Sequence, residues 1–155
     1  MDSANTACRF HLLMLCQRAG RNREALPVCE EMIRAEPTNA FHRISLGNLY
    51  TRLGQTAEAG AAFQEAFTLA PRRPETCFAL AQFYLRSGTN LTEAAKLAQQ
   101  AVELAPAPPH YYLLSRVQAK AGDRSAARAA IARACELAPQ NREYQTWRRA
   151  LEGAQ

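Results

Sequence analysis

Features that mark several protein classes are missing from this chain of 155 residues. It contains no run of 18 apolar residues, so no segment is expected to cross a bilayer. Its 7 glycines and 8 prolines are too few for a collagen-like or linker-like chain. With 48% hydrophobic and 21% charged residues, the chain can bury about two-thirds of its unfolded surface, as one folded domain does.

Sequence patterns typical of enzymes and metalloproteins are also missing. The five cysteines are odd in number and form no Cys-x-x-Cys pair, so neither a disulfide framework nor a zinc site is indicated. No Gly-rich phosphate loop occurs, and the three histidines lie outside any metal-binding motif: His11, His42 and His110. We therefore expect no enzymatic activity, no catalytic or metal-binding residue and no cofactor. Unpaired cysteines predict a cytoplasmic location.

What the sequence does contain is a repeat of about 34 residues. Glycine recurs in one register at Gly20, Gly54, Gly88 and Gly122. Leucine recurs in the same register at Leu12, Leu46, Leu80 and Leu114. Prolines follow with nearly the same spacing at Pro37, Pro71, Pro106 and Pro139, the last three after Leu-Ala.

Each repeat is predicted to contain two helices. Apolar residues before each glycine follow gaps of three and four, and the glycine suits the left-handed backbone at a helix end. The second helix carries small or apolar residues at spacings near four and stops before proline. Asn90 followed by Glu93 indicates a capping box at one second helix, and Asp123 indicates an N-cap at another.

None of the helix pairs can bury its apolar surface alone, so the pairs are expected to stack. The predicted fold class is all-α, a right-handed α-solenoid of four helix pairs plus a C-terminal capping helix. We expect one domain over 1–155, with repeats at about 6–37, 40–71, 74–106 and 108–139 and the capping helix at about 141–152. Small residues are expected to let the paired helices approach closely, for example Gly47 against Ala59 and Ser115 against Ala127.

These residues resemble the tetratricopeptide-repeat family, whose signature combines an aromatic residue, Leu-Gly, Tyr, Ala, Phe and Pro at set spacings. The second repeat matches best, through Leu46, Gly47, Tyr50, Gly54, Ala59, Phe63, Ala66 and Pro71. The first repeat departs from the pattern, with Leu13 at the small position, Cys16 at the Tyr position and Cys29 at the Phe position. The resemblance covers residues 6–139 and is specific for fold, whereas one fold hosts many functions.

In a solenoid of this kind the first helices line the concave face, where two stripes are predicted. One is apolar or aromatic and recurs every 34 residues, and the other is basic. The candidate peptide-binding residues are Phe10, Met14, Arg18, Phe41, Ile44, Asn48, Arg52, Phe78, Gln82, Arg86, Tyr112, Arg116 and Lys120. An apolar row beside a cationic row is typical of a peptide groove. A basic residue late in a helix also suits the helix dipole, so the basic stripe alone fits a solvated face as well.

The leading hypothesis is a non-enzymatic interaction module, a scaffold or adaptor that holds a partner peptide or helix in the concave groove. The partner is expected to carry apolar and acidic residues. The family's clamp for the acidic tails of heat-shock chaperones requires basic and amide residues where Phe10, Met14, Glu75 and Ala79 stand. We therefore do not expect a chaperone-tail ligand.

Two alternatives stay open. The formal charge of +5 and eight basic residues beyond residue 106 suggest nucleic acid or another anionic surface, although no RNA-reading pattern interleaves aromatic and basic residues. These basic residues are Arg116, Lys120, Arg124, Arg128, Arg133, Arg142, Arg148 and Arg149. The other alternative is the repeat segment of a larger bacterial enzyme or secretion protein. The sequence predicts no oligomeric state.

Overall fold

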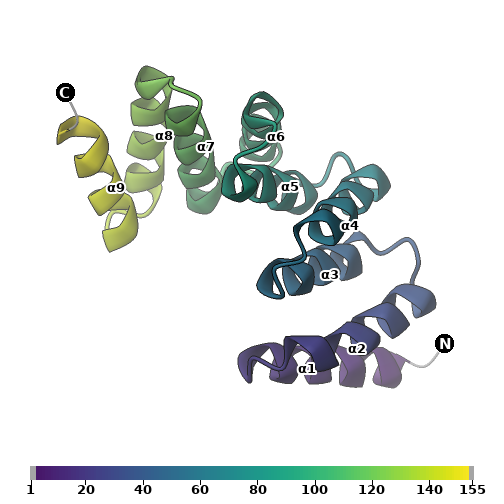
Figure 1. The fold of residues 1–155 in the computed structure, drawn as a ribbon. Coiled ribbons are helices and arrows are strands. Elements are labelled where there is room, and N and C mark those ends of the chain that lie inside the picture. Colours follow the sequence, from purple (N-terminus) through teal and green to yellow (C-terminus); the bar gives the residue numbers. More distant parts are fainter. Residues whose placement is uncertain (1–2, 154–155) are drawn as a thin grey trace. The chain divides into compact units, whose positions relative to one another are not determined.

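The computed structural model describes residues 3–153, so the predicted domain limits at 1 and 155 lie outside the described residues. The described chain is all helical (Figure 1). Its helices are α1 (Ser3–Arg18), α2 (Asn22–Ala35), α3 (Ala40–Arg52), α4 (Thr56–Leu69), α5 (Pro74–Ser87), α6 (Leu91–Leu104), α7 (Pro108–Lys120), α8 (Arg124–Leu137) and α9 (Arg142–Gly153). The predicted all-α helical-repeat class is confirmed.

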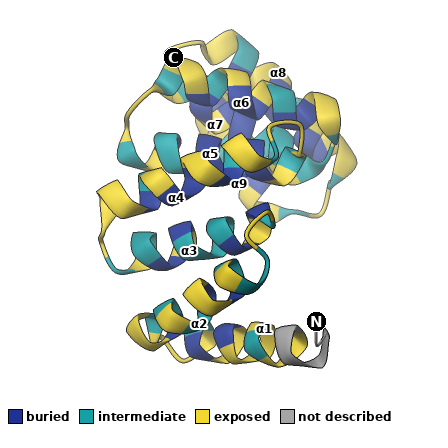
Figure 2. Cartoon of the chain, turned by 90° about the vertical axis from the view of Figure 1, so that its right-hand side faces the viewer, coloured by how far each residue is buried: buried dark blue, intermediate teal, exposed yellow. Residues whose placement is uncertain are grey.

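The helices form two compact units that meet in sequence at Pro71 and Arg72. Helices α1 to α4 belong to the first unit, and α5 to α9 belong to the second. Each unit is built from first and second helices in alternation, and each helix has a buried and an exposed face (Figure 2).

Turn chemistry explains where the first helices end. Gly20, Gly54, Gly88 and Gly122 all have positive φ, between 71° and 94°, as the repeat register predicts.

The starts of two second helices test the predicted caps. Asp123 accepts a hydrogen bond from the Ala126 N–H and caps α8 as predicted. The predicted capping box at Asn90 is wrong, because Asn90 has a φ of 48° and its side chain makes no cap bond to α6. The turn from Gly88 to Asn90 uses this asparagine as a second left-handed residue instead.

The core of the first unit lies between α1, α2 and α3. Leu13, Cys16, Ala25, Cys29, Met32 and Leu49 form one buried cluster, and Leu46 packs against it. Leu12 occupies the register of Leu46 and yet is 48% exposed, whereas Leu13 is buried. The physical reason is that Leu46 packs against a cluster that includes the preceding helix, and no helix precedes α1 in the described chain.

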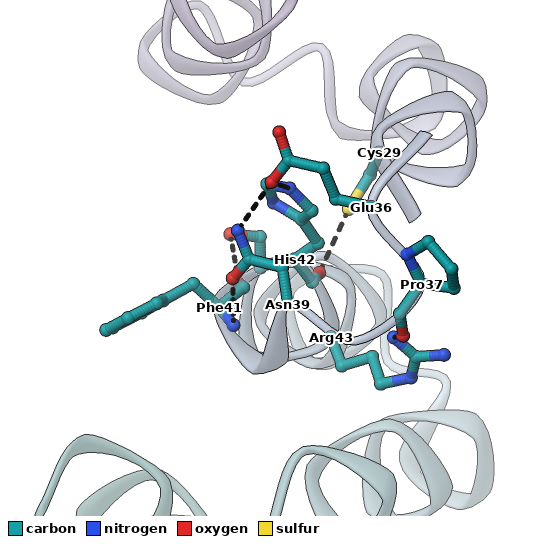
Figure 3. Close-up of polar contacts among 8 residues, drawn as sticks. Cys29, Glu36, Pro37, Asn39, Phe41, His42 and Arg43 are labelled. Carbon is teal, nitrogen blue, oxygen red and sulfur yellow. Dashed lines mark hydrogen bonds and ion pairs between the residues drawn. The ribbon is translucent and has the colours of Figure 1, made fainter. Parts of the chain in front are cut away.

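Polar contacts fix the connection between α2 and α3 (Figure 3). Asn39 accepts a hydrogen bond from the Phe41 N–H at 3.1 Å, and its amide donates to Glu36 at 2.8 Å. The same Glu36 oxygen lies 3.0 Å from His42 Nε2. The buried Cys29 thiol donates to the His42 carbonyl, and burial raises the pKa of this thiol to about 11. The cysteine therefore serves as a core residue and not as a reactive thiol.

Small residues allow the paired helices to approach closely. Ala59, Ala81, Ala94, Ser115 and Ala127 are all fully buried. Ser115 Oγ donates to the Ala127 carbonyl at 2.7 Å, which places this predicted pair together. Gly47 faces the ring of Phe63, since a Cβ added at Gly47 would lie 2.9 Å from two ring carbons.

Replacing Gly47 by Leu is expected to lower the free energy of unfolding by roughly 1 to 3 kcal/mol, because the added side chain overpacks against Phe63. Urea unfolding followed by circular dichroism measures this change. The matched control is Asn48→Leu, at the neighbouring exposed position of α3. A Gly47→Leu protein as stable as this control would show that the ring can move aside without cost.

The last helix covers the end of the second unit. Tyr144 and Leu151 of α9 are buried in a cluster with four residues of α8: Ala127, Ile131, Ala134 and Cys135. Arg128 on α8 donates two hydrogen bonds to the Leu151 carbonyl, at 3.1 and 2.8 Å. An arginine that binds a carbonyl near the end of a helix satisfies a group that has no intrahelical partner.

Deleting residues 141 to 155 is expected to expose the apolar face of α8 and so to lower the melting temperature or cause self-association. Calorimetry and light scattering after size exclusion measure these effects. The control is Arg149→Ala, at an exposed position of α9 that lies outside the cluster. A truncated protein that stays monomeric and melts with the intact chain would contradict the capping role of α9.

Candidate peptide-binding surface

The predicted groove residues lie on the first helices of both units. In the first unit, Phe10, Met14 and Phe41 are between 42% and 52% exposed, and Ile44 is half-buried. Arg18, Asn48 and Arg52 are exposed on the same helices. In the second unit, Phe78, Gln82 and Tyr112 are half-buried, while Arg86, Arg116 and Lys120 are exposed. The apolar stripe is therefore solvent-facing in the first unit and partly covered in the second.

The basic stripe has a structural role that the sequence did not indicate. Arg52 Nη1 donates to the Gln17 carbonyl at 3.2 Å, and Lys120 Nζ donates to the Leu85 carbonyl at 2.9 Å. Both bonds span 35 residues and reach the last turn of the first helix in the preceding repeat. Carbonyls in the last turn of a helix lack the donor four residues ahead that the rest of the helix supplies, and a repeat-spaced cation donates to them. The Gln17 carbonyl also accepts the Gly20 N–H at 3.3 Å. These two residues bind the protein itself as well as facing solvent.

Replacing Lys120 by Met is expected to lower the free energy of unfolding by about 0.5 to 1.5 kcal/mol, the usual net contribution of one hydrogen bond. Thermal or urea unfolding tests this structural role. The control Arg133→Met removes an equal charge from an exposed pair with Glu136 on α8, where a change within about 0.5 kcal/mol is expected. Equal stability of the two variants would mean that the bond to Leu85 contributes nothing.

Three of the predicted residues meet in one pocket of the second unit. The pocket has a volume of about 460 Å³ and lies where the ends of α5 and α7 approach α9. We call it the basic pocket, lined by the cations Arg86, Arg116, Lys120 and Arg124 and by Leu85, Ala119, Trp147, Ala150 and Leu151. No acidic side chain is among these lining residues. Four cations beside apolar lining residues attract an anionic group and offer it a partly desolvated site.

A second hollow lies beside the basic pocket between α7 and α9. It has a volume of about 330 Å³, and we call it the apolar pocket, lined by Tyr112, Arg142, Glu143, Thr146, Trp147 and Ala150. Trp147 and Ala150 line both pockets. Arg116 lies over the Tyr112 ring, 5.6 Å from its centroid, and so links the α7 residues of the two pockets. The two hollows therefore form neighbouring parts of one surface.

Hydrogen bonds hold the residues around these pockets in place. Trp147 Nε1 donates to Ser115 Oγ at 2.9 Å, and the fully buried Ser115 hydroxyl donates to Ala127. The Tyr112 hydroxyl donates to Glu143 at 2.8 Å, and the Tyr112 ring lies 4.9 Å from that of Tyr144. Burial, followed by the bond to Glu143, raises the pKa of Tyr112, so its hydroxyl stays a proton donor at neutral pH. Both aromatic walls are preorganised for contact with a ligand.

The structure adds residues that the sequence analysis missed at this surface, among them Trp147, Arg124 and Leu151. Trp147 lies 34 residues after Leu113, so the repeat register itself marks α9 as a further first helix. That register could have placed Trp147 beside the groove. Phe78 lies near His110, with ring centroids 5.4 Å apart, and neither it nor Gln82 lines either pocket.

The described part of the chain offers no metal site and no helix suited to a bilayer. Within it, no three His, Cys, Asp or Glu side chains are grouped so that they could hold a metal ion. None of the helices in residues 3–153 has the length and apolar character that a bilayer crossing requires.

Comparison with known families identifies the repeat. Residues 43–73 and 111–141 match the family described as Tetratricopeptide repeat. These segments cover parts of the second and fourth predicted repeats. A comparison with curated proteins finds no match.

Solved structures of similar fold cover most of the chain. TTC0263, a protein with this repeat from Thermus thermophilus, gives a TM-score of 0.82 at 18% identity, covering 95% of this chain and 81% of its own. MamA from Desulfovibrio magneticus RS-1 gives a TM-score of 0.81 at 20% identity, and the match covers 96% of this chain and 84% of the MamA chain. The first repeat domain of RPAP3, solved with an HSP90 peptide, gives a TM-score of 0.69 at 22% identity. This match covers 75% of this chain and 92% of the RPAP3 domain. At these identities the likeness establishes the fold.

Proposed function

We propose that this chain, which belongs to the tetratricopeptide-repeat family, is a non-enzymatic interaction module that holds an extended segment of a partner protein against its first helices. The observation that carries the proposal is the basic pocket, in which four cations and several apolar side chains line one hollow beside half-buried aromatic residues. The partner segment supplies acidic and apolar side chains. The candidate residues of the first unit, from Phe10 to Arg52, place the same kinds of apolar and basic side chain on the first helices of that unit.

Affinity and steering are assigned to different residues. Apolar contact with Phe78, Tyr112 and Trp147 removes hydrocarbon from water and so slows dissociation of the partner. Arg86 and Arg116 attract acidic groups before contact and so speed association. Lys120 contributes charge while its bond to Leu85 holds α5 and α7 together.

The solved complex of the RPAP3 repeat domain with an HSP90 peptide supports peptide binding as a mode that this fold allows. That ligand belongs to RPAP3 and is not transferred to this chain. Phe10, Met14, Glu75 and Ala79 still stand where the chaperone-tail clamp requires other residues. The proposal places the module in the cytoplasm, because its free cysteines suit a reducing compartment.

A nucleic-acid partner is disfavoured by what the C-terminal cations contact. Arg128 binds the Leu151 carbonyl, Arg133 pairs with Glu136, and Arg148 pairs with Glu152. Three of the eight basic residues that suggested an anionic polymer are therefore engaged within the second unit. Of the other five, Arg116, Lys120 and Arg124 line the basic pocket, and Lys120 also binds the Leu85 carbonyl. The apolar lining of this pocket fits a side chain better than a continuous phosphate backbone.

The proposal is tested by selecting peptides from a displayed random library on the full chain and measuring their binding by biolayer interferometry. The selected peptides are expected to carry acidic and apolar residues. Arg86→Glu with Arg116→Glu should slow association at least tenfold and abolish its salt dependence. Phe78→Ala should speed dissociation instead, with association little changed.

Circular dichroism of both variants confirms that helix content is intact. The control Arg133→Glu places the same charge change on α8, outside both pockets. If the selected peptides bind every variant like the original chain, the first-helix surface of the second unit is not the site. If no peptide is selected at all, the proposed function is wrong.

A further inference from the structure

The two pockets together define a spacing between ligand side chains. Along α7 the apolar pocket is lined by Tyr112 and the basic pocket by residues 116 to 120. A rise of 1.5 Å per helical residue separates these positions by about 6 to 12 Å. Along α9 the pockets overlap at Trp147 and Ala150, which places their centres nearer the lower end of this range.

In an extended peptide, side chains two residues apart point to the same face and lie about 6.5 to 7 Å apart. Adjacent side chains point to opposite faces, so they cannot enter both pockets. Side chains four residues apart lie about 13 Å apart and overshoot the range. The pocket separation therefore fits side chains two residues apart.

The charges around the pockets determine which side chain enters which pocket. The basic pocket has four cations and no acidic lining residue. The apolar pocket is lined by one cation and one carboxylate, Arg142 and Glu143, so it has no excess of positive charge. The Glu143 carboxylate accepts a hydrogen bond from the Tyr112 hydroxyl and repels a second carboxylate. Aromatic surface from Tyr112 and Trp147 lines the apolar pocket and favours an aromatic or large aliphatic side chain.

We infer that the second unit recognises an extended peptide in which an acidic residue and a large apolar residue are separated by one residue. The acidic side chain enters the basic pocket, and the apolar side chain enters the apolar pocket, on the two sides of Trp147. This inference rests on the proposed function and adds to it the ligand's side-chain order and spacing. It concerns α5, α7, α8 and α9 only, which all belong to one unit.

The single tryptophan of the chain provides a direct measurement, because Trp147 lines both pockets. The probes are tryptophan-free peptides with blocked termini and a Gly-Ser background, containing Glu-Ser-Phe or Phe-Ser-Glu. Matched peptides place Glu and Phe side by side, separate them by three residues, or replace Glu by Lys. Titration of Trp147 emission up to about 1 mM peptide gives the dissociation constant of each.

One of the two peptides with a single intervening residue is expected to bind at least tenfold more tightly than the adjacent, the longer-spaced and the Lys peptides. Arg116→Glu should weaken this peptide at least tenfold, whereas Arg133→Glu should leave its affinity unchanged. Thr146→Arg should also weaken it at least tenfold. That variant fills the apolar pocket and adds a positive charge, so attraction by charge alone would instead predict tighter binding.

Equal binding of all spacings, or tighter binding by Thr146→Arg, would overturn the inference. It would also be overturned if a ten-residue oligothymidylate displaced the best peptide at equal concentration, since the pocket would then bind phosphate chains. If library-selected peptides bind the chain but show no preferred spacing, the inference fails and the proposed function stands. If neither the designed peptides nor the library yields a ligand, both fail.

Discussion

Close approach of the two helices within each repeat is the contact on which the rest of the structure depends. It requires small residues at the crossing, and Ala81, Ala94 and Ala127 are fully buried there. At Gly47 even a methyl group would meet the Phe63 ring. Because each pair packs so closely, its remaining apolar surface lies on the outer faces and must be covered by the neighbouring pair.

This constraint explains the different ends of the chain. At α9, Tyr144 and Leu151 cover the apolar face of α8, and Arg128 ties the two helices together. At α1, Leu12 and Leu15 occupy register positions that later first helices bury or partly bury. Their side chains nevertheless stay 48% and 50% exposed. Among residues 3–153, α9 is the last first helix and covers the second helix before it, whereas no second helix precedes α1 to cover it.

The same stacking also shapes the candidate site. Arg52 and Lys120 donate hydrogen bonds to carbonyls in the last turns of the preceding first helices. These two residues of the basic stripe therefore stabilise the fold whether or not a ligand is bound. Arg86, Arg116 and Arg124 then gather around the pocket that α9 closes. A ligand surface made in this way combines charge required for stability with charge that faces solvent. Substitutions in the stripe must therefore be compared with a stability measurement before they are assigned to binding.

The sequence by itself determined the helical repeat, because glycine, leucine and proline recur at a period typical of stacked helix pairs and because local backbone preferences act over a few residues. It also placed Arg86, Arg116 and Lys120 on one face of the first helices. Only the tertiary structure decided that Leu13 and not Leu12 is buried, that Gly47 faces Phe63, and that Trp147 lines two pockets. These outcomes depend on contacts between residues far apart in the chain, and periodicity fixes a residue's face but not the side chain that it meets.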